Sequence, residues 1–418
     1  MKVRLPPGLV AVPSVAAIAC GAPNATDADL GSQESALGAS MEHVAAFGDN
    51  PAGLAMYVHA PASAQAKAPL VVALHGCTQT AAAYAAVGWN ELADRYGFYV
   101  VYPEQSTANS PLRCFNFGGK YGDASNLTRG KGENASIKSM VDKMKADHAI
   151  DPMRVFVTGL SAGGAQAALM LATWPDVFAA GAPIAGVPYA CATSYAELNT
   201  CIKPGKMLSA KEWGARVRAA NPSFAGPWPR VSVWQGTGDA VVDPNDLKQL
   251  VLQWTDVHGA PSAPSRMDHV DGASHAVYRD TSGTDVVESY EIPGMAHGTP
   301  VDPAHGCGTA GPYVLDAHIC SSLLIARFFG IADGATAGGA GGAGGAGAAG
   351  PGSGGLGASP SGATPSSASA SSACPTSSGC RASGGQGGAP AGSLAALALV
   401  VAARRRRRSA SPTPRSHP

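Results

Sequence analysis

Arg-Val-Phe-Val-Thr-Gly-Leu-Ser-Ala-Gly-Gly (RVFVTGLSAGG, residues 154–164) is a β-branched, apolar run that ends in a Gly-x-Ser-x-Gly motif. A helix-like segment, 165–173, follows directly. A Gly-x-Ser-x-Gly motif between a strand and a helix places its serine on a tight turn, with the hydroxyl clear of the sheet. Gly159 and Gly163 would keep side chains out of the space where strand and helix approach each other. The motif therefore predicts Ser161 as the nucleophile of an acyl-transfer reaction.

Strands and helices are expected to alternate on both sides of this motif. Apolar runs predict strands at 70–74, 99–102, 155–158, 180–184, 231–234 and 286–292, and periodicity predicts helices at 90–96, 136–147 and 165–173. Apolar strands that alternate with helices are typical of a parallel sheet covered on both faces. We therefore expect an α/β protein of α/β-hydrolase architecture, with a mostly parallel sheet and helices on both faces.

The acid of a Ser–Asp–His triad is predicted downstream of Ser161, because α/β-hydrolases carry serine, acid and histidine in that order. Strand 231–234 is followed by Gln-Gly-Thr-Gly and then Asp239, which places this carboxylate past the carboxyl end of the strand. Asp239 is therefore the predicted acid. Asp243 is the alternative, although Pro244 beside it makes Asp243 a better turn former.

The predicted base is His297. Strand 286–292 leads into Pro-Gly-Met-Ala-His-Gly, so His297 lies on a glycine-flanked loop at the same edge of the sheet as the serine. Any one of the 11 histidines is by itself more often a surface or core side chain, so position and chain order single out His297. His258 and His275 are weaker alternatives, because neither follows a predicted strand.

Two backbone N–H groups should form the oxyanion hole. The N–H of Ala162 lies at the start of the helix after Ser161, where free amides and the helix dipole favour an anion. The second donor is predicted to be the N–H of Cys77, in the His-Gly-Cys-Thr loop after strand 70–74. His75 is interpreted as a structural residue of this loop. Cys77 as a nucleophile is the weaker alternative, because no strand–turn–helix elbow surrounds it.

Composition indicates a folded part joined to low-complexity sequence. The chain has 418 residues, of which 14% are charged, with 53 glycines and 32 prolines. Seven arginines and no acidic residues lie at or after Arg381, so residues 1–380 are net acidic although the whole chain has a formal net charge of zero. An acidic folded part argues against a nucleic-acid partner, which would require a basic face.

The N-terminal residues 1–20 are predicted to be a signal peptide. Lys2 and Arg4 precede a small apolar stretch, 9–19, which ends in Ala-Ile-Ala before Cys20. A small residue before Cys20 leaves a lipoprotein signal open as the alternative. Residues 21–45 are interpreted as a flexible spacer, and residues 46–331 as the catalytic domain.

The C-terminal part is expected to lie outside this domain. Residues 332–379 are rich in Gly, Ala and Ser and predict a disordered linker. Segment 380–418 carries Cys380, a short apolar run and the arginine cluster 404–408. This order resembles the myxobacterial C-terminal sorting signal, which implies cell-surface location and anchoring through the tail. The alternative is a low-complexity tail with a chance apolar patch.

Export changes how the cysteines are interpreted. Six of the nine lie between the predicted signal and the tail, and an even number in an oxidising compartment indicates disulfides. Local spacing favours Cys191–Cys201 and Cys307–Cys320, which leaves Cys77 with Cys114, one of several connectivities open to six cysteines. No Cys-x-x-Cys occurs and no histidine has zinc-site spacing to these cysteines, so no metal site is expected.

Seven stretches together carry a resemblance to a known family: LHGCT (74–78), GWNELADRYGFYVVYPE (88–104), CFN (114–116), RGKGE (129–133), DPMRVFVTGLSAGG (151–164), FAAGAPIAGVPYAC (178–191) and GPWPRVSVWQGTGD (226–239). Residues from about 70 to 329 resemble the extracellular short-chain-length polyhydroxyalkanoate (polyhydroxybutyrate) depolymerases. The resemblance implies a secreted serine esterase whose substrate is a polyester or its oligomers. The reaction requires no cofactor.

The same superfamily contains feruloyl and acetylxylan esterases, so esterase action on plant cell-wall polysaccharide stays open as the alternative. The sequence departs from the family pattern at two places that concern the substrate. The family commonly continues Cys-Phe-Asn with tryptophan and phenylalanine, whereas Phe117 is followed here by Gly118 and Gly119. Polymer-degrading members usually carry a polymer-binding domain after the linker, whereas the predicted sorting segment stands here. The first departure lies in a loop that is expected to shape the substrate cleft. The second leaves soluble oligomers and surface-exposed polymer as candidate substrates.

Overall fold

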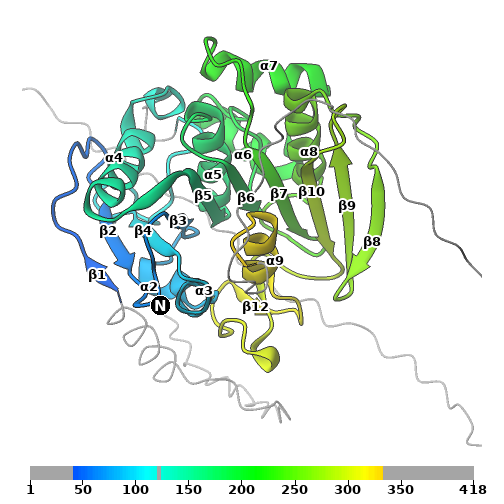
Figure 1. Ribbon diagram of the computed structural model, residues 1–418. Helices are drawn as coiled ribbons and strands as arrows, with labels where there is room; N and C mark the ends of the chain where they lie inside the picture. The colour runs from blue at the N-terminus through cyan, green and yellow to red at the C-terminus, as the bar shows by residue number, and fades with distance from the viewer. Residues whose placement is uncertain (1–40, 120–123, 333–418) are drawn as a thin grey trace, which may run out of the picture. The chain divides into compact units, whose positions relative to one another are not determined.

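The computed structural model describes residues 41–119 and 124–332, whose arrangement Figure 1 shows. The strands are β1 (Glu42–His43), β2 (Ala55–His59), β3 (Ala68–Leu74), β4 (Tyr99–Glu104), β5 (Ile150–Leu160), β6 (Ala180–Ile184), β7 (Arg230–Gly236), β8 (Arg266–Val270), β9 (Ala273–Arg279), β10 (Asp285–Ile292), β11 (Thr299–Val301) and β12 (Val314–Asp316). The helices are α2 (Ala81–Ala85), α3 (Trp89–Tyr96), α4 (Gly132–Asp147), α5 (Ala162–Thr173), α6 (Tyr195–Thr200), α7 (Ala210–Ala220), α8 (Asn245–His258) and α9 (Ser321–Phe328), with short turns η2 (Ala124–Leu127), η3 (Cys201–Gly205) and η4 (Pro303–His305).

A ten-stranded sheet is the centre of the described residues, in the order β1-β2-β4-β3-β5-β6-β7-β10-β9-β8. The six strands from β4 to β10 in this order run parallel to one another. The outer strands β1 and β2 on one side, and β9 and β8 on the other, pair antiparallel. This mostly parallel sheet with helices on both faces confirms the expected α/β-hydrolase fold.

The two faces of the sheet bury two separate apolar clusters. Alternate residues of β3 divide between them: Leu70 and Val72 pack with α4, α5 and α8, whereas Val71 and Ala73 pack with α2, α3 and α9. All of these β3 residues are at most 1% exposed. The predicted apolar face of α4 (Ile137, Met140, Val141 and Met144) lies in the first cluster. Burial on both faces is why β3 and β6 contain no polar side chain.

Every predicted strand and helix is present, and the boundaries differ at the ends. Helix α5 begins at Ala162 rather than at 165, because it starts directly after the serine turn. The expected spacer 21–45 is wrong at its C-terminal end: Met41 is buried, and β1 pairs with β2. A two-residue strand carries too short a pattern to be detected. Strand β8 was also missed, because its residues are almost all exposed and show no apolar alternation.

Most residues of the predicted signal peptide and spacer, and almost all of those of the linker and sorting segment, lie outside the described residues. Within 41–119 and 124–332, no helix has the length and apolar character needed to cross a membrane.

Asp246, in the first turn of α8, is the most unusual buried acid of the described residues. It is 0% exposed, and neither carboxylate oxygen has a hydrogen-bond partner there. Burial, with the nearby charges of Asp243 and Asp239, raises the pKa of Asp246 to about 8 from 3.8. The folded protein therefore holds a proton on Asp246 between about pH 4 and pH 8, where the unfolded chain has released it, and stability falls as pH rises through this window.

Replacing Asp246 by asparagine, which does not ionise, removes this pH-dependent loss of folding stability. We expect Asp246→Asn to be more stable than the wild type by on the order of 2–4 kcal/mol at pH 8, with the difference shrinking toward pH 4. Thermal unfolding from pH 4 to pH 8 measures this, with Asp147→Asn on the surface of α4 as the matched control. A stability difference that does not change with pH would contradict the account.

Candidate active site

Strand β5 leads into helix α5 (Figure 1), and Ser161 lies on a strained turn between them. Its φ of 57° and ψ of −118° are rare for a residue with a side chain, and its N–H donates to the carbonyl of Ile184 at 2.8 Å. A Cβ on Gly159 would come within 2.6 Å of the carbonyl oxygen of Leu74. A Cβ on Gly163 would overlap the same oxygen. The two glycines therefore permit the close approach that the sequence pattern predicted.

Asp239 and His297 are brought together from two different loops. The Nδ1 atom of His297 lies 2.7 Å from Oδ2 of Asp239. The Asp239 side chain is 0% exposed and that of His297 is 9% exposed. A carboxylate can only accept, so Nδ1–H of His297 donates, and Nε2 is left free of the proton. A histidine in this tautomer can act as a general base.

Backbone groups hold Asp239 in place. Its Oδ1 accepts the N–H groups of Val241 at 2.8 Å and Val242 at 3.0 Å, and its Oδ2 also accepts Nε2 of Gln235 at 2.9 Å. Burial alone would raise the pKa of Asp239, but His297 and the backbone N–H groups of Val241 and Val242 bring that pKa below its usual value. The carboxylate is therefore ionised at neutral pH.

The loops that carry Asp239 and His297 are joined directly. The N–H of Thr237 donates to Ile292 at 3.0 Å, and the N–H of Gly238 donates to Met295 at 3.0 Å. The hydroxyl of Thr237 accepts the N–H of Gly294 at 2.8 Å. These bonds follow from the sheet order, because β7 and β10 are parallel neighbours and end at the same edge.

The predicted oxyanion loop follows β3, at the edge where β5 reaches Ser161. His75 is 0% exposed, and its ring links two backbone groups: Nδ1–H donates to the carbonyl of Gly76 at 2.7 Å, and Nε2 accepts the N–H of Gln105 at 3.0 Å. Burial lowers the pKa of His75 to about 4, so the ring is neutral. These contacts agree with a structural role for His75.

The N–H groups on either side of Cys77 are occupied. That of Gly76 donates to Oε1 of Gln79 at 2.9 Å, and that of Thr78 donates to the carbonyl of Leu112 at 2.6 Å. Among the described residues, the Cys77 and Ala162 N–H groups have no such acceptor. Both are therefore available to a bound oxyanion.

All three expected disulfides are confirmed: Cys77–Cys114, Cys191–Cys201 and Cys307–Cys320. The first closes the loop after β3, which also rules out a free thiol nucleophile at Cys77 in this structure.

The weaker alternatives lie in other environments. Asp243 accepts the N–H of Asn245 at 3.0 Å and forms the turn before α8. His258 ends α8 and contacts the carbonyl of Pro229 at 2.9 Å. His275 lies inside β9, between Asp268 and Glu288 at 2.7 and 3.2 Å.

Two contributors to the site were missed from the sequence. Gln235 holds Asp239, and the sequence shows it as a polar residue at the end of a mostly apolar strand. The ring of Tyr313 lies edge-on to His297, with 6.1 Å between centroids, and is 42% exposed. No local sequence pattern points to Tyr313. It lies sixteen residues after His297 in the sequence, and the pairing of β11 with β12 brings it beside that histidine.

Residues 53–267 match the model of the family described as "Esterase PHB depolymerase". Poly(3-hydroxyalkanoate) depolymerase C of Paucimonas lemoignei is 50% identical over 295 residues, which cover 70% of each chain. Feruloyl esterase B of Talaromyces funiculosus is 32% identical over 274 residues, covering 64% of this chain and 75% of the relative.

Among solved structures, the acetyl xylan esterase from Aspergillus awamori is similar with a TM-score of 0.55 and 27% sequence identity. The match covers 62% of this chain and 94% of that structure. These relatives are carboxylic ester hydrolases, and such chemistry uses a strained serine turn and a His–Asp pair, which this chain carries at the same edge of its sheet. The chain belongs to the PHB depolymerase esterase family and is a carboxylic ester hydrolase with the α/β-hydrolase fold.

Proposed function

We propose that this protein hydrolyses polyhydroxyalkanoate esters, as polymer or as oligomers, through an acyl-enzyme on Ser161. The observation that carries the proposal is the 2.7 Å contact between His297 Nδ1 and Asp239 Oδ2, at the sheet edge where β5 presents Ser161. Ser161, His297 and Asp239 are then the nucleophile, the base and the acid that orients the base.

The proposed steps use only groups of this chain. Nε2 of His297 takes the proton of the Ser161 hydroxyl as its oxygen attacks the ester carbonyl. The Asp239 carboxylate stabilises the imidazolium that forms. His297 then gives the proton to the leaving alcohol, and water repeats the attack on the acyl-enzyme to release the acid.

The oxyanion of each tetrahedral intermediate would be held by the N–H groups of Cys77 and Ala162. A donor of this kind is worth about 3 kcal/mol of transition-state stabilisation. The Cys77–Cys114 disulfide and the two bonds of the neutral His75 ring hold the first donor. The start of the twelve-residue helix α5 holds the second.

Two observations support a hydroxyalkanoate substrate. Identity is 50% to a poly(3-hydroxyalkanoate) depolymerase, compared with 32% to a feruloyl esterase. Val241, beside the acid, and Tyr313, beside the base, are 50% and 42% exposed. An aliphatic polyester would cover such residues.

The second candidate is removal of feruloyl or acetyl groups from plant cell-wall polysaccharide. The observation that favours it is the structural similarity to an acetyl xylan esterase, which covers 94% of that chain.

We also propose that the protein is exported. Three disulfides within the described residues support an oxidising compartment, and the basic and apolar residues before Cys20 support a signal peptide. The tail 380–418 would then retain the enzyme at the cell surface.

A substrate panel tests the reaction and its specificity. Purified protein is assayed on polyhydroxybutyrate film, 3-hydroxybutyrate oligomers, methyl ferulate and acetylated xylan. We expect 3-hydroxybutyrate release from oligomers or film with kcat/KM at least tenfold above that for methyl ferulate, because identity is 50% to a poly(3-hydroxyalkanoate) depolymerase and 32% to a feruloyl esterase. Release of ferulate or acetate without 3-hydroxybutyrate would favour the cell-wall esterase over the polyhydroxyalkanoate hydrolase. Ser161→Ala is the background control.

Asp239→Asn tests the role of the acid. The asparagine keeps the shape but favours the wrong tautomer of His297, so kcat on oligomers should fall about 10⁴-fold while KM changes less than about threefold. Steady-state kinetics measures both, with Asp243→Asn as the matched control. A loss in the control equal to that in Asp239→Asn would reassign the acid.

A further inference from the structure

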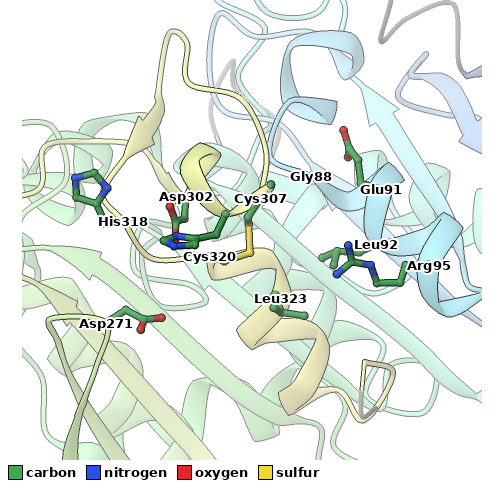
Figure 2. Close-up of a pocket in the computed structure, with 12 residues that line it drawn as sticks. Gly88, Glu91, Leu92, Arg95, Asp271, Asp302, Cys307, His318, Cys320 and Leu323 are labelled. Carbon is green, nitrogen blue, oxygen red and sulfur yellow. A yellow bond between two sulfur atoms is a disulfide. The ribbon is translucent and has the colours of Figure 1, made fainter. Parts of the chain in front are cut away.

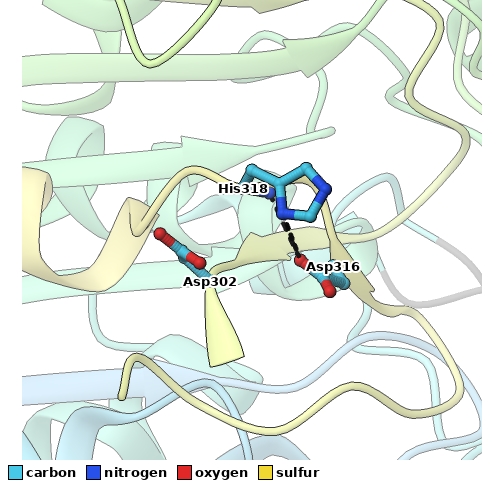
Figure 3. Close-up of side chains that lie close together, drawn as sticks. All are labelled: Asp302, Asp316 and His318. Atoms are coloured by element: carbon cyan, nitrogen blue, oxygen red, sulfur yellow. Dashed lines mark hydrogen bonds and ion pairs between the residues drawn. The ribbon is translucent and has the colours of Figure 1, made fainter. Parts of the chain in front are cut away.

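Three metal-ligand side chains meet on the small β11–β12 sheet. Asp302, Asp316 and His318 each offer one oxygen or nitrogen atom, and these atoms lie within 4.8 Å of one another (Figure 3). None of the three has a role in the proposed ester hydrolysis.

The scaffold under this cluster is held at several points. Val301 of β11 pairs with Asp316 of β12, so Asp302 follows directly beside the second acid. Asp302 forms an antiparallel bridge with Cys307, and Cys307 is joined by a disulfide to Cys320, two residues after His318. The backbone under the three residues is therefore fixed, and Nδ1 of His318 contacts Oδ1 of Asp316 at 3.2 Å.

Asp302 supplies an independent sign of a ligand. The residue is only 8% exposed, and its Oδ2 accepts Nδ1–H of His305 at 2.6 Å. Its Oδ1 is buried and has no hydrogen-bond partner among the described residues. Buried carboxylate oxygens are almost always hydrogen-bonded or bound to an ion, so an uncompensated one requires an explanation.

A pocket of about 350 Å³ opens beside the cluster (Figure 2). Asp302 and His318 line it, together with Glu91, Asp271 and Arg95. Three carboxylates against one guanidinium favour the entry of a cation.

We propose that Asp302, Asp316 and His318 bind a divalent cation of the zinc class. Two carboxylates and one imidazole suit Zn²⁺, which binds nitrogen and oxygen ligands and accepts three protein ligands plus water. The imidazole disfavours Ca²⁺ and Mg²⁺, which take oxygen ligands. The cation would compensate the buried Oδ1 atom of Asp302.

The proposed cation site lies next to the segment that carries His297 and would stabilise it. β11 begins two residues after His297, and the N–H of Thr299 donates to the carbonyl of Tyr313, the residue whose ring lies beside His297. A cation that bridges Asp302 and Asp316 would fasten β11 to β12. Its binding should therefore stabilise the fold, and this expectation does not depend on the substrate.

Zinc titration of the full chain tests the proposal. Protein freed of metal with a chelator is titrated with ZnCl₂ by calorimetry. The wild type is compared with Asp302→Asn and His318→Ala. His269→Ala is the control, because His269 is an exposed histidine of β8 outside the cluster. We expect the wild type and the control to bind one equivalent more than His318→Ala, at micromolar affinity or tighter. Binding should be at least tenfold weaker in Asp302→Asn. Zinc should raise the thermal midpoint of the wild type, and not of His318→Ala, by a few degrees.

Circular dichroism checks that each variant is folded. Equal zinc stoichiometry and affinity in the wild type and folded His318→Ala would overturn the proposal, because the metal would then bind elsewhere. Tighter binding of Ca²⁺ than of Zn²⁺ in a parallel titration would overturn the assigned cation class.

Discussion

The contact between helix α5 and the end of strand β3 is the constraint on which the site depends. At Gly163 the helix backbone lies so close to Leu74 and His75 that no side chain fits between them. This contact places the turn of Ser161 next to the loop that carries Cys77. The nucleophile and both proposed oxyanion donors are therefore placed by backbone packing, which leaves little freedom for rearrangement during the reaction.

Sheet order places the rest of the site. β5, β6, β7 and β10 are successive parallel strands, so the residues that follow β5, β7 and β10 share one edge. The loops after β7 and β10 then bond to each other through Thr237 and Gly238. Asp239 and His297 meet because their loops are already joined, and the buried donors around Asp239 maintain its charge.

The sequence predicts the parallel core well, because β3 and β6 are buried and entirely apolar, and the other central strands contain apolar runs. Ser161, Asp239 and His297 lie after β5, β7 and β10, as expected for a parallel sheet, and their catalytic roles stay predictions. The antiparallel edges were harder to predict: β8 is exposed, and β1 has two residues. Tyr313 and the cluster at Asp302 depend on the β11–β12 pairing and on the Cys307–Cys320 bridge, which are contacts that no local pattern encodes.

In the proposed mechanism Ser161 is the single activated nucleophile. Reaction of the folded protein with a serine-directed fluorophosphonate, followed by peptide mass spectrometry, tests this role. We expect one adduct, on the peptide that contains Ser161, and none in Ser161→Ala. An unlabelled wild type, or an adduct on another residue that persists in Ser161→Ala, would contradict it.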